Sequence, residues 1–270
     1  MKPTGAVCGP LPPDSLKDDR LYEDLQALQP DLFVVVAFRI LPKRLFELPR
    51  LGSINVHASL LPKYRGAAPI HWALINGEKE TGLTSFFLKQ KVDTGNVILQ
   101  EKIPIGDEDT YDTLSARMSE ATGGFLLRSL DAIEDGRLSP EVQDESEATP
   151  APKITPFDAM IDFGFPAENV RNFVRGLATK PGAFTSFRGS KLKVHACRTA
   201  EQSGPAETRP GTCIGAAKKL LIQCRESAVE LTRVVPSGKK ETDGKSFING
   251  YRPAEGEVFG EVLAEESRQT

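Results

Sequence analysis

The first half of the chain alternates between short apolar runs and stretches with helical spacing. Residues 32–38, LFVVVAF, are continuously apolar and rich in β-branched side chains, which is typical of a strand buried on both faces of a parallel sheet. Three further strands are predicted at 53–58, 81–88 and 97–105, and helices are predicted at 16–28, 43–48, 67–76 and 110–133. Because strands alternate with helices, this half is expected to form a doubly wound α/β domain.

The second half has a different pattern, which begins after a polar, proline-containing segment at 139–156. That segment is interpreted as an extended linker. A helix is predicted at 167–177, and short strands follow at 182–187, 191–196, 212–216, 219–224 and 228–235. Short strands at close spacing favour a small β-barrel. We therefore divide the chain into a first domain (1–138), a linker (139–156), a second domain (157–260) and a tail (261–270).

Composition narrows the class of protein. The chain is 39% hydrophobic and 26% charged, as is ordinary for a globular protein, and no apolar run approaches the ~18 residues that span a bilayer. Four scattered cysteines without a CxxC pair favour free thiols in the cytoplasm and argue against a metal site. Residues 157–270 hold 17 Lys and Arg against 14 Asp and Glu, although the whole chain has a formal net charge of −3. This mildly basic second half permits contact with a polyanion.

Candidate chemistry appears where the second predicted strand ends, in SINVHASLLPKYRG. Alternation along a strand places Asn55 and His57 on the same face, next to a loop rich in turn residues. Taken alone, Asn55 could cap a turn and His57 could be a core histidine with satisfied hydrogen bonds. The same structural interpretation suits His71, beside Trp72 in a predicted helix, and His195 in an amphipathic strand.

A third polar residue, Asp93, favours a functional role for Asn55 and His57 over a structural one. It lies in the loop KVDTGNV, just after another predicted buried strand. Loops at the carboxyl ends of strands gather at one edge of an open α/β sheet, so Asn55, His57 and Asp93 can converge there. An amide donor can stabilise a developing oxyanion, His can transfer a proton near neutral pH, and Asp can orient the His. The trio suits acyl transfer to an amine, which needs no Ser or Cys nucleophile.

The segments SINVHASLLPKYRGAAPIHWAL and LKQKVDTGNVI together resemble the folate-dependent formyltransferase family. The resemblance continues through PEVQDE, APKIT and GLATKPGAFTSFRGSKLKV, so that it covers roughly residues 15–260. It implies a Rossmann-like formyltransferase domain followed by a small OB-like β-barrel domain that helps to hold tRNA. It also implies that Asn55, His57 and Asp93 are the catalytic trio.

The resemblance further implies the substrates. The formyl donor would be N10-formyltetrahydrofolate, and the acceptor would be the free amino group of methionyl initiator tRNA. The residues expected to bind folate are Phe38, Arg39, Ile40, Leu41, Ser59, Leu60, Leu61 and Pro62. Those expected to contact tRNA are Lys63, Arg65, Lys191 and Lys193. We expect no metal, no membrane contact and a monomer in the cytoplasm.

Two departures from the family pattern leave alternatives open. Family members begin with a strand that ends in a G-T-P type turn, and no such pattern precedes Leu32, so we expect a catalytic domain that is incomplete at its start. The segment Arg39-Ile40-Leu41-Pro42 resembles the pterin-holding segment of the purine-pathway formyltransferases. The alternatives are therefore a formyltransferase acting on a small amine, such as a nucleotide sugar or glycinamide ribotide, and an inactive fragment that folds poorly or only binds RNA.

Overall fold

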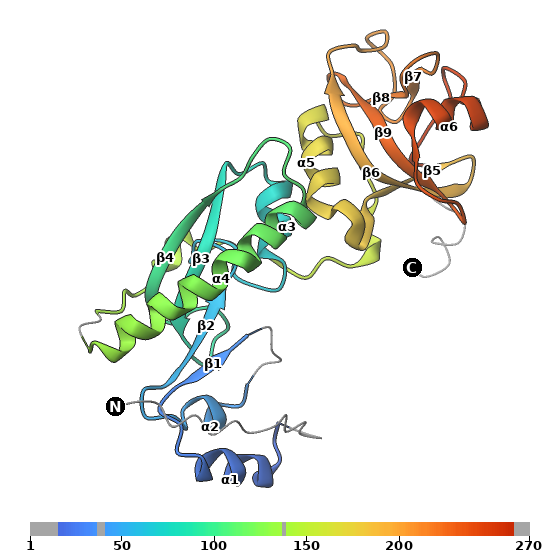
Figure 1. Ribbon diagram of the computed structural model, residues 1–270. Coiled ribbons are helices and arrows are strands. Elements are labelled where there is room, and N and C mark those ends of the chain that lie inside the picture. The colour runs from blue at the N-terminus through green and yellow to red at the C-terminus, as the bar shows by residue number, and fades with distance from the viewer. Residues whose placement is uncertain (1–15, 37–40, 137–138, 262–270) are drawn as a thin grey trace.

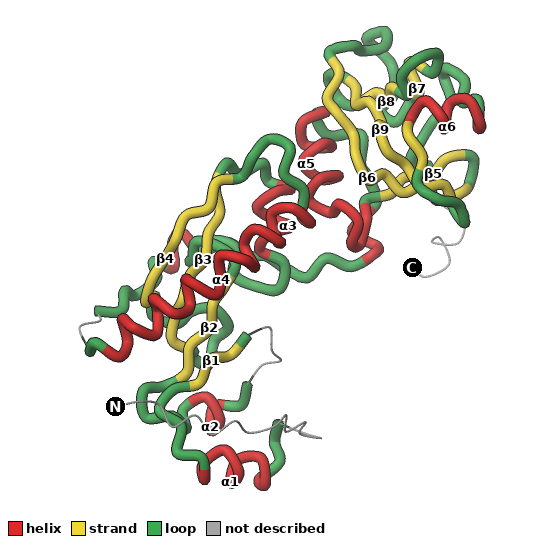
Figure 2. The backbone as a smooth tube through the Cα atoms, viewed as in Figure 1, coloured by secondary structure: helices red, strands yellow, loops and turns green. Residues whose placement is uncertain are grey.

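The computed structural model describes residues 16–36, 41–136 and 139–261. The chain forms two bodies, each built around a sheet, and helices α3 and α5 lie where the two bodies meet (Figure 1). The tube view shows the two groups of strands separated by these helices (Figure 2). Three predicted folate contacts, Phe38, Arg39 and Ile40, fall outside the described residues, as does Cys8.

The first body contains a four-stranded sheet in the order β1-β2-β3-β4. Its strands are β1 (Phe33–Val35), β2 (Ser53–His57), β3 (Glu80–Phe87) and β4 (Val97–Pro104). Only β1 and β2 are parallel, whereas β2–β3 and β3–β4 are antiparallel. The expectation of a doubly wound parallel sheet is thus wrong for the described residues, which form a mixed α/β domain. The connection 88–96 is too short for a parallel crossover and makes β3 and β4 a hairpin.

Strand β1 is more exposed than its composition predicted. Among the described residues it pairs only with β2, and Val34 is 40% exposed. Val36, just beyond its end, is 57% exposed. The prediction of a strand buried on both faces is therefore wrong for the described part of 32–38, because no described strand covers its outer edge.

The described part of this body has four helices: α1 (Asp19–Ala27), α2 (Lys43–Phe46), α3 (Pro69–Ile75) and α4 (Tyr111–Glu134). Thr110 caps α4, because it exchanges side-chain-to-backbone hydrogen bonds with Thr113 in a capping box. The apolar stripe of α4 packs against β3 and β4 through Leu114, Met118 and Phe125, all of which are buried. No helix within the described ranges is long and apolar enough to cross a membrane.

Two exposed glycines inside α4 lead to a stability prediction. An added Cβ on Gly124 would meet nothing closer than the Arg128 guanidinium at 3.7 Å, and one on Gly123 would meet no atom within 4 Å. We expect Gly124→Ala to raise the free energy of unfolding by roughly 0.5–1 kcal/mol, because Ala loses less backbone entropy in a helix. Urea unfolding measures the change. The control is Gly136→Ala, where φ is +65° and the same substitution should destabilise. A stabilised Gly136→Ala would contradict the argument.

The predicted linker lies against the first body. Glu141 pairs with Val97 through two backbone hydrogen bonds of 2.8 and 2.9 Å, and a short 3₁₀ turn spans Glu145–Glu147. Arg65 and Ala151 are also joined, since the Ala151 N–H donates to the Arg65 carbonyl at 2.7 Å. These bonds fix the segment to the start of β4 and to the loop that follows β2.

The second body is an antiparallel sheet in the order β5-β6-β9-β8-β7, with β10 paired to β9. A 3₁₀ turn (Pro156–Ala159), helix α5 (Ala167–Leu177) and an irregular helical turn (Ala178–Gly182) precede it. The strands are β5 (Phe184–Phe187), β6 (Ser190–Ala200), β7 (Cys213–Gly215), β8 (Leu221–Gln223), β9 (Ala228–Pro236) and β10 (Thr242–Asp243), and α6 (Gly244–Tyr251) follows. Three thiols, Cys197, Cys213 and Cys224, are buried in its core.

The expected barrel is not formed, because β5 and β7 do not pair. Residues near the end of the described chain lie between them instead. The Cys213 N–H donates to the Glu257 carbonyl at 2.7 Å, and the Gly260 N–H donates to the Ser186 carbonyl at 3.1 Å. Phe259 packs its ring on Phe187 in the same gap. This segment makes only an isolated antiparallel bridge, between Thr212 and Val258, and it fills the place that a barrel would close, so the sheet stays open.

Helices α3 and α5 join the two bodies through buried polar contacts. The His71 Nδ1–H donates to the Gly176 carbonyl at 2.7 Å, and the His71 ring stacks on Tyr111. Burial lowers the pKa of His71, which favours the neutral ring. Arg175 donates to the carbonyls of Gly106 and Asp109 at 3.1 and 3.3 Å. These bonds cross from one body to the other and fix how they meet.

Candidate active site

Strand β2 carries two of the predicted catalytic residues. Asn55 lies opposite Phe86 of β3, and His57 lies opposite Thr84. They are two residues apart on an extended strand, so their side chains share one face. His57 is the last residue of β2 and is 7% exposed, which places its ring where the strand opens into the loop 58–68.

The loop after β2 fixes the tautomer of His57. Its Nε2 lies 2.8 Å from the backbone carbonyl of Tyr64. A carbonyl can only accept, so Nε2 carries the hydrogen and the neutral ring keeps its lone pair on Nδ1. Tyr64 has φ of +61°, and its hydroxyl donates to Glu78 at 2.6 Å, so the residue that orients His57 is itself held. Burial raises the pKa of Tyr64 to about 12.

Asp93 lies beside the free nitrogen of His57. Its Oδ2 is 3.8 Å from His57 Nδ1 and accepts a 2.9 Å hydrogen bond from the Gly66 N–H. The Asp93 backbone has φ of +54°, in the left-handed region that Asp tolerates better than most residues. The structure thus brings His57 and Asp93 together, with two acceptor atoms facing each other across a gap that a hydrogen-bond donor could fill.

The Asn55 side chain, near the end of β2, is the third predicted catalytic group. Its Oδ1 is buried and has no hydrogen-bond partner among the described residues. A buried polar atom left unpaired costs roughly 1–3 kcal/mol, and such an atom at a polar edge marks a place where a ligand can supply the partner.

The predicted folate-binding loop 59–62 is tied into the protein. Ser59 is buried and donates to the Lys63 carbonyl at 2.6 Å, and the Leu61 N–H donates to Thr84 Oγ1 at 3.1 Å. Leu60 and Pro62 are partly exposed, as is Leu41, the described member of the predicted 38–41 segment. Ser59 and Leu61 therefore shape this loop more than they face solvent.

The predicted tRNA contacts lie in three different settings. Lys63 is exposed in the loop after β2, whereas the Arg65 side chain is only 12% exposed and bonds to Gln143 and Glu145. Lys191 and Lys193 lie on β6 of the second body, where the Lys191 ammonium sits 3.5 Å from the centre of the Phe184 ring.

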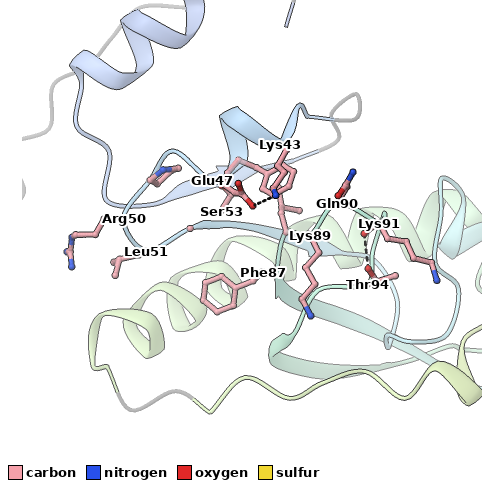
Figure 3. Close-up of a pocket in the computed structure, with 14 residues that line it drawn as sticks. Lys43, Glu47, Arg50, Leu51, Ser53, Phe87, Lys89, Gln90, Lys91 and Thr94 are labelled. Atoms are coloured by element: carbon pink, nitrogen blue, oxygen red, sulfur yellow. Dashed lines mark hydrogen bonds and ion pairs between the residues drawn. The ribbon is translucent and has the colours of Figure 1, made fainter. Parts of the chain in front are cut away.

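A cleft of about 720 Å³ lies beside the loop that carries Asp93. Helix α2 and the start of β2 form one side, and residues 87–94 form the other (Figure 3). Its lining includes four basic side chains, Lys43, Arg50, Lys89 and Lys91, against one acidic side chain, Glu47. None of these four basic side chains was singled out from the sequence, because a lone Lys or Arg in a short helix or turn carries no motif. The described residues hold no cluster of His, Cys, Asp or Glu arranged for a metal ion.

Comparison with known proteins agrees with this combination of fold and site. Residues 6–130 match the formyl transferase family, and residues 153–252 match the formyl transferase C-terminal domain. The methionyl-tRNA formyltransferase of Moorella thermoacetica is 40% identical over 265 residues, which cover 96% of this chain and 84% of that protein.

Two solved structures share the fold. HypX from Aquifex aeolicus in complex with tetrahydrofolic acid has a TM-score of 0.62 at 18% identity, covering 88% of this chain and 42% of HypX. The methionyl-tRNA formyltransferase from Clostridium thermocellum has a TM-score of 0.55 at 22% identity, covering 70% of this chain and 80% of that protein.

The chain therefore belongs to the formyl transferase family, with its N-terminal and C-terminal domains both represented. Its sequence relatives at about 40% identity over most of the chain place it among the methionyl-tRNA formyltransferases, which are transferase enzymes.

Proposed function

We propose that the chain transfers a formyl group from N10-formyltetrahydrofolate to the α-amino group of methionyl initiator tRNA. The observation that carries the proposal is the facing pair of His57 Nδ1 and Asp93 Oδ2, 3.8 Å apart, together with the Asn55 Oδ1 that has no partner among the described residues. A folate co-substrate supplies the formyl group, and the residues of this chain orient the acceptor, move its proton and hold the developing charge.

His57 acts as the proton acceptor in this proposal. Its Nε2–H is committed to the Tyr64 carbonyl, so only Nδ1 can receive a proton from the attacking amine. An α-amine has a reference pKa near ~8, so this proton needs no strong base. The Asp93 carboxylate stabilises the imidazolium that results, and His57 can then return the proton to the leaving nitrogen.

Asn55 acts on the formyl oxygen. Its amide nitrogen donates to the oxygen as negative charge develops there, and its carbonyl oxygen can accept an N–H from the incoming amine. The second interaction would give the buried Oδ1 the partner that the described residues do not supply.

The cleft beside residues 87–94 suits the folate. Its volume of about 720 Å³ lies within the ~300–1,000 Å³ usual for small-ligand sites. It reaches Thr94, the residue after Asp93, and Lys89, which bonds to the neutral Asn96 side chain, suits a carboxylate of the folate tail. The other basic side chains, Lys43, Arg50 and Lys91, are ion-paired with Glu47, Asp31 and Glu145.

The tRNA would contact both bodies. Residues 1–138 would bind its aminoacyl end, where formyl transfer takes place, and residues 157–260 would bind another part of the tRNA. Exposed Lys63 near the site and Lys191 and Lys193 on β6 can bind phosphates as point charges. For Arg65, the bonds to Gln143 and Glu145 favour a bracing role in the same loop. A monomer working in the cytoplasm stays a prediction.

The test is formyl transfer by the purified chain from N10-formyltetrahydrofolate to methionylated initiator tRNA, compared with a dTDP-amino sugar and glycinamide ribotide as acceptors. Turnover on the tRNA alone supports the proposal. Turnover on a small amine alone would redirect it to the small-amine alternative. No turnover by a chain that unfolds cooperatively would refute it for this chain.

A further inference from the structure

Gln143 connects two loops of the candidate site through one buried side chain. It lies in the segment PEVQDE, to which the proposed reaction assigns no role, and it is 7% exposed. Its Nε2 donates to the carbonyls of Asp93 and Gly95 at 3.0 and 2.7 Å. Its Oε1 accepts from Arg65 Nε and Nη2 at 3.0 and 2.7 Å. Both the nitrogen and the oxygen of the Gln143 side-chain amide therefore make hydrogen bonds.

These bonds close a ring around Asp93. Gly66, which donates its N–H to the Asp93 carboxylate at 2.9 Å, is bonded in sequence to Arg65, whose guanidinium is held by Gln143. Gln143 in turn holds the Asp93 backbone. Both the carboxylate and the main chain of Asp93 are thus fixed by groups that meet at a single side chain.

The backbone of Asp93 needs such support. Its φ of +54° lies in the left-handed region, which costs free energy for a non-glycine residue although Asp tolerates it better than most, so holding the backbone there benefits from fixed neighbours. Gln143 is itself anchored, because its neighbour Glu141 pairs with Val97 and Arg65 also binds Glu145 at 2.9 and 3.0 Å. The support therefore comes from an ordered segment outside the sheet.

We propose that Gln143 is a positioning residue that sets the distance between Asp93 and His57. The inference rests on the proposed function, because it assigns Gln143 a part in the same proton transfer. Gln143 makes no contact with the reacting atoms. It acts through the Asp93 backbone and through the Arg65–Gly66 loop.

The decisive variant is Gln143→Glu, which keeps the shape and the acceptor for Arg65 but removes the donor to the two carbonyls. We expect kcat to fall by about 10- to 100-fold, because displacing a reacting group by about an ångström has an effect of that order. The KM for methionylated initiator tRNA should stay within about threefold, since no tRNA contact changes. Amide hydrogen exchange over residues 93–96 should become faster.

A double-mutant cycle separates positioning from general stability. In an Asp93→Ala background, adding Gln143→Glu should cost less than about threefold further in single-turnover rate, because the effect passes through Asp93. The matched control is Gln223→Glu in the second body, where a 5% exposed Gln also donates to a backbone carbonyl, that of Cys224 at 2.7 Å. This control should lower the melting temperature and leave kcat unchanged.

The outcomes are distinguishable. Full activity of Asp93→Ala would defeat the proposed mechanism itself. An inactive Asp93→Ala with Gln143→Glu within twofold of the parent chain would overturn only the positioning role, as would a full multiplicative loss in the double variant. If Gln143→Glu fails to fold, Gln143→Met, which removes the same donor without adding charge, is judged by the same criteria.

Discussion

Replacing Asn55 by Ala should reduce the turnover of formyl transfer by about 10²–10³-fold while the fold stays intact. The reason is that the lost amide donates to the oxygen that gains negative charge. Because the buried Oδ1 has no partner among the described residues, its removal should leave the melting temperature unchanged or raise it. His57→Ala should reduce turnover by at least ~10² through loss of the proton acceptor.

Turnover and thermal unfolding are measured on the same preparations. The control for Asn55→Ala is Asn249→Ala on the exposed side of α6, which should change neither quantity. A loss of less than tenfold in either active-site variant would remove that residue from the mechanism. A large drop in melting temperature with Asn55→Ala would instead show that the amide is structural.

Replacing Gly95 by Ala should be the most destabilising single-methyl change near the site. An added Cβ would lie 1.5 Å from the Phe87 carbonyl oxygen, so the backbone of the 88–96 connection must move. We expect a loss on the order of 3 kcal/mol or more in the free energy of unfolding, because the clash involves rigid backbone. The same movement would displace Asp93, so turnover should also fall.

Urea unfolding checks the first effect and the formylation assay checks the second. Gly124→Ala serves as the control, since the same methyl group there meets only a flexible Arg128 side chain. A loss below about 1 kcal/mol for Gly95→Ala would mean that the connection can shift without breaking the β3–β4 pairing.

Much of the fold followed from local sequence signals. Helix α5 begins and ends as predicted, at Ala167 and Leu177, and helix α4, Tyr111–Glu134, lies within one residue of the predicted 110–133 at each end. Strand direction was not predicted correctly, because a buried apolar run has the same composition in parallel and antiparallel sheets. The open second sheet was missed for a related reason, since the segment around Phe259 that fills the gap has no strand pattern.

The candidate site shows a similar division. Asn55, His57 and Asp93 were visible because polar residues at the end of an apolar strand are unusual. Gln143 could not be found this way, because a Gln in a polar segment is ordinary until the folded chain places its amide between two loops. The Tyr64 carbonyl that fixes the His57 tautomer is a backbone group and carries no sequence signal.

The contact between α3 and α5 joins the two bodies of the molecule. The bonds that His71 and Arg175 make across the contact hold the two bodies together, and with them the separation between Asp93 in one body and Lys193 in the other. Only an acceptor long enough to span that separation can use both ends at once. A short aminoacyl ester would reach the chemistry without gaining the second set of contacts, so its kcat/KM should be lower than that of the full tRNA.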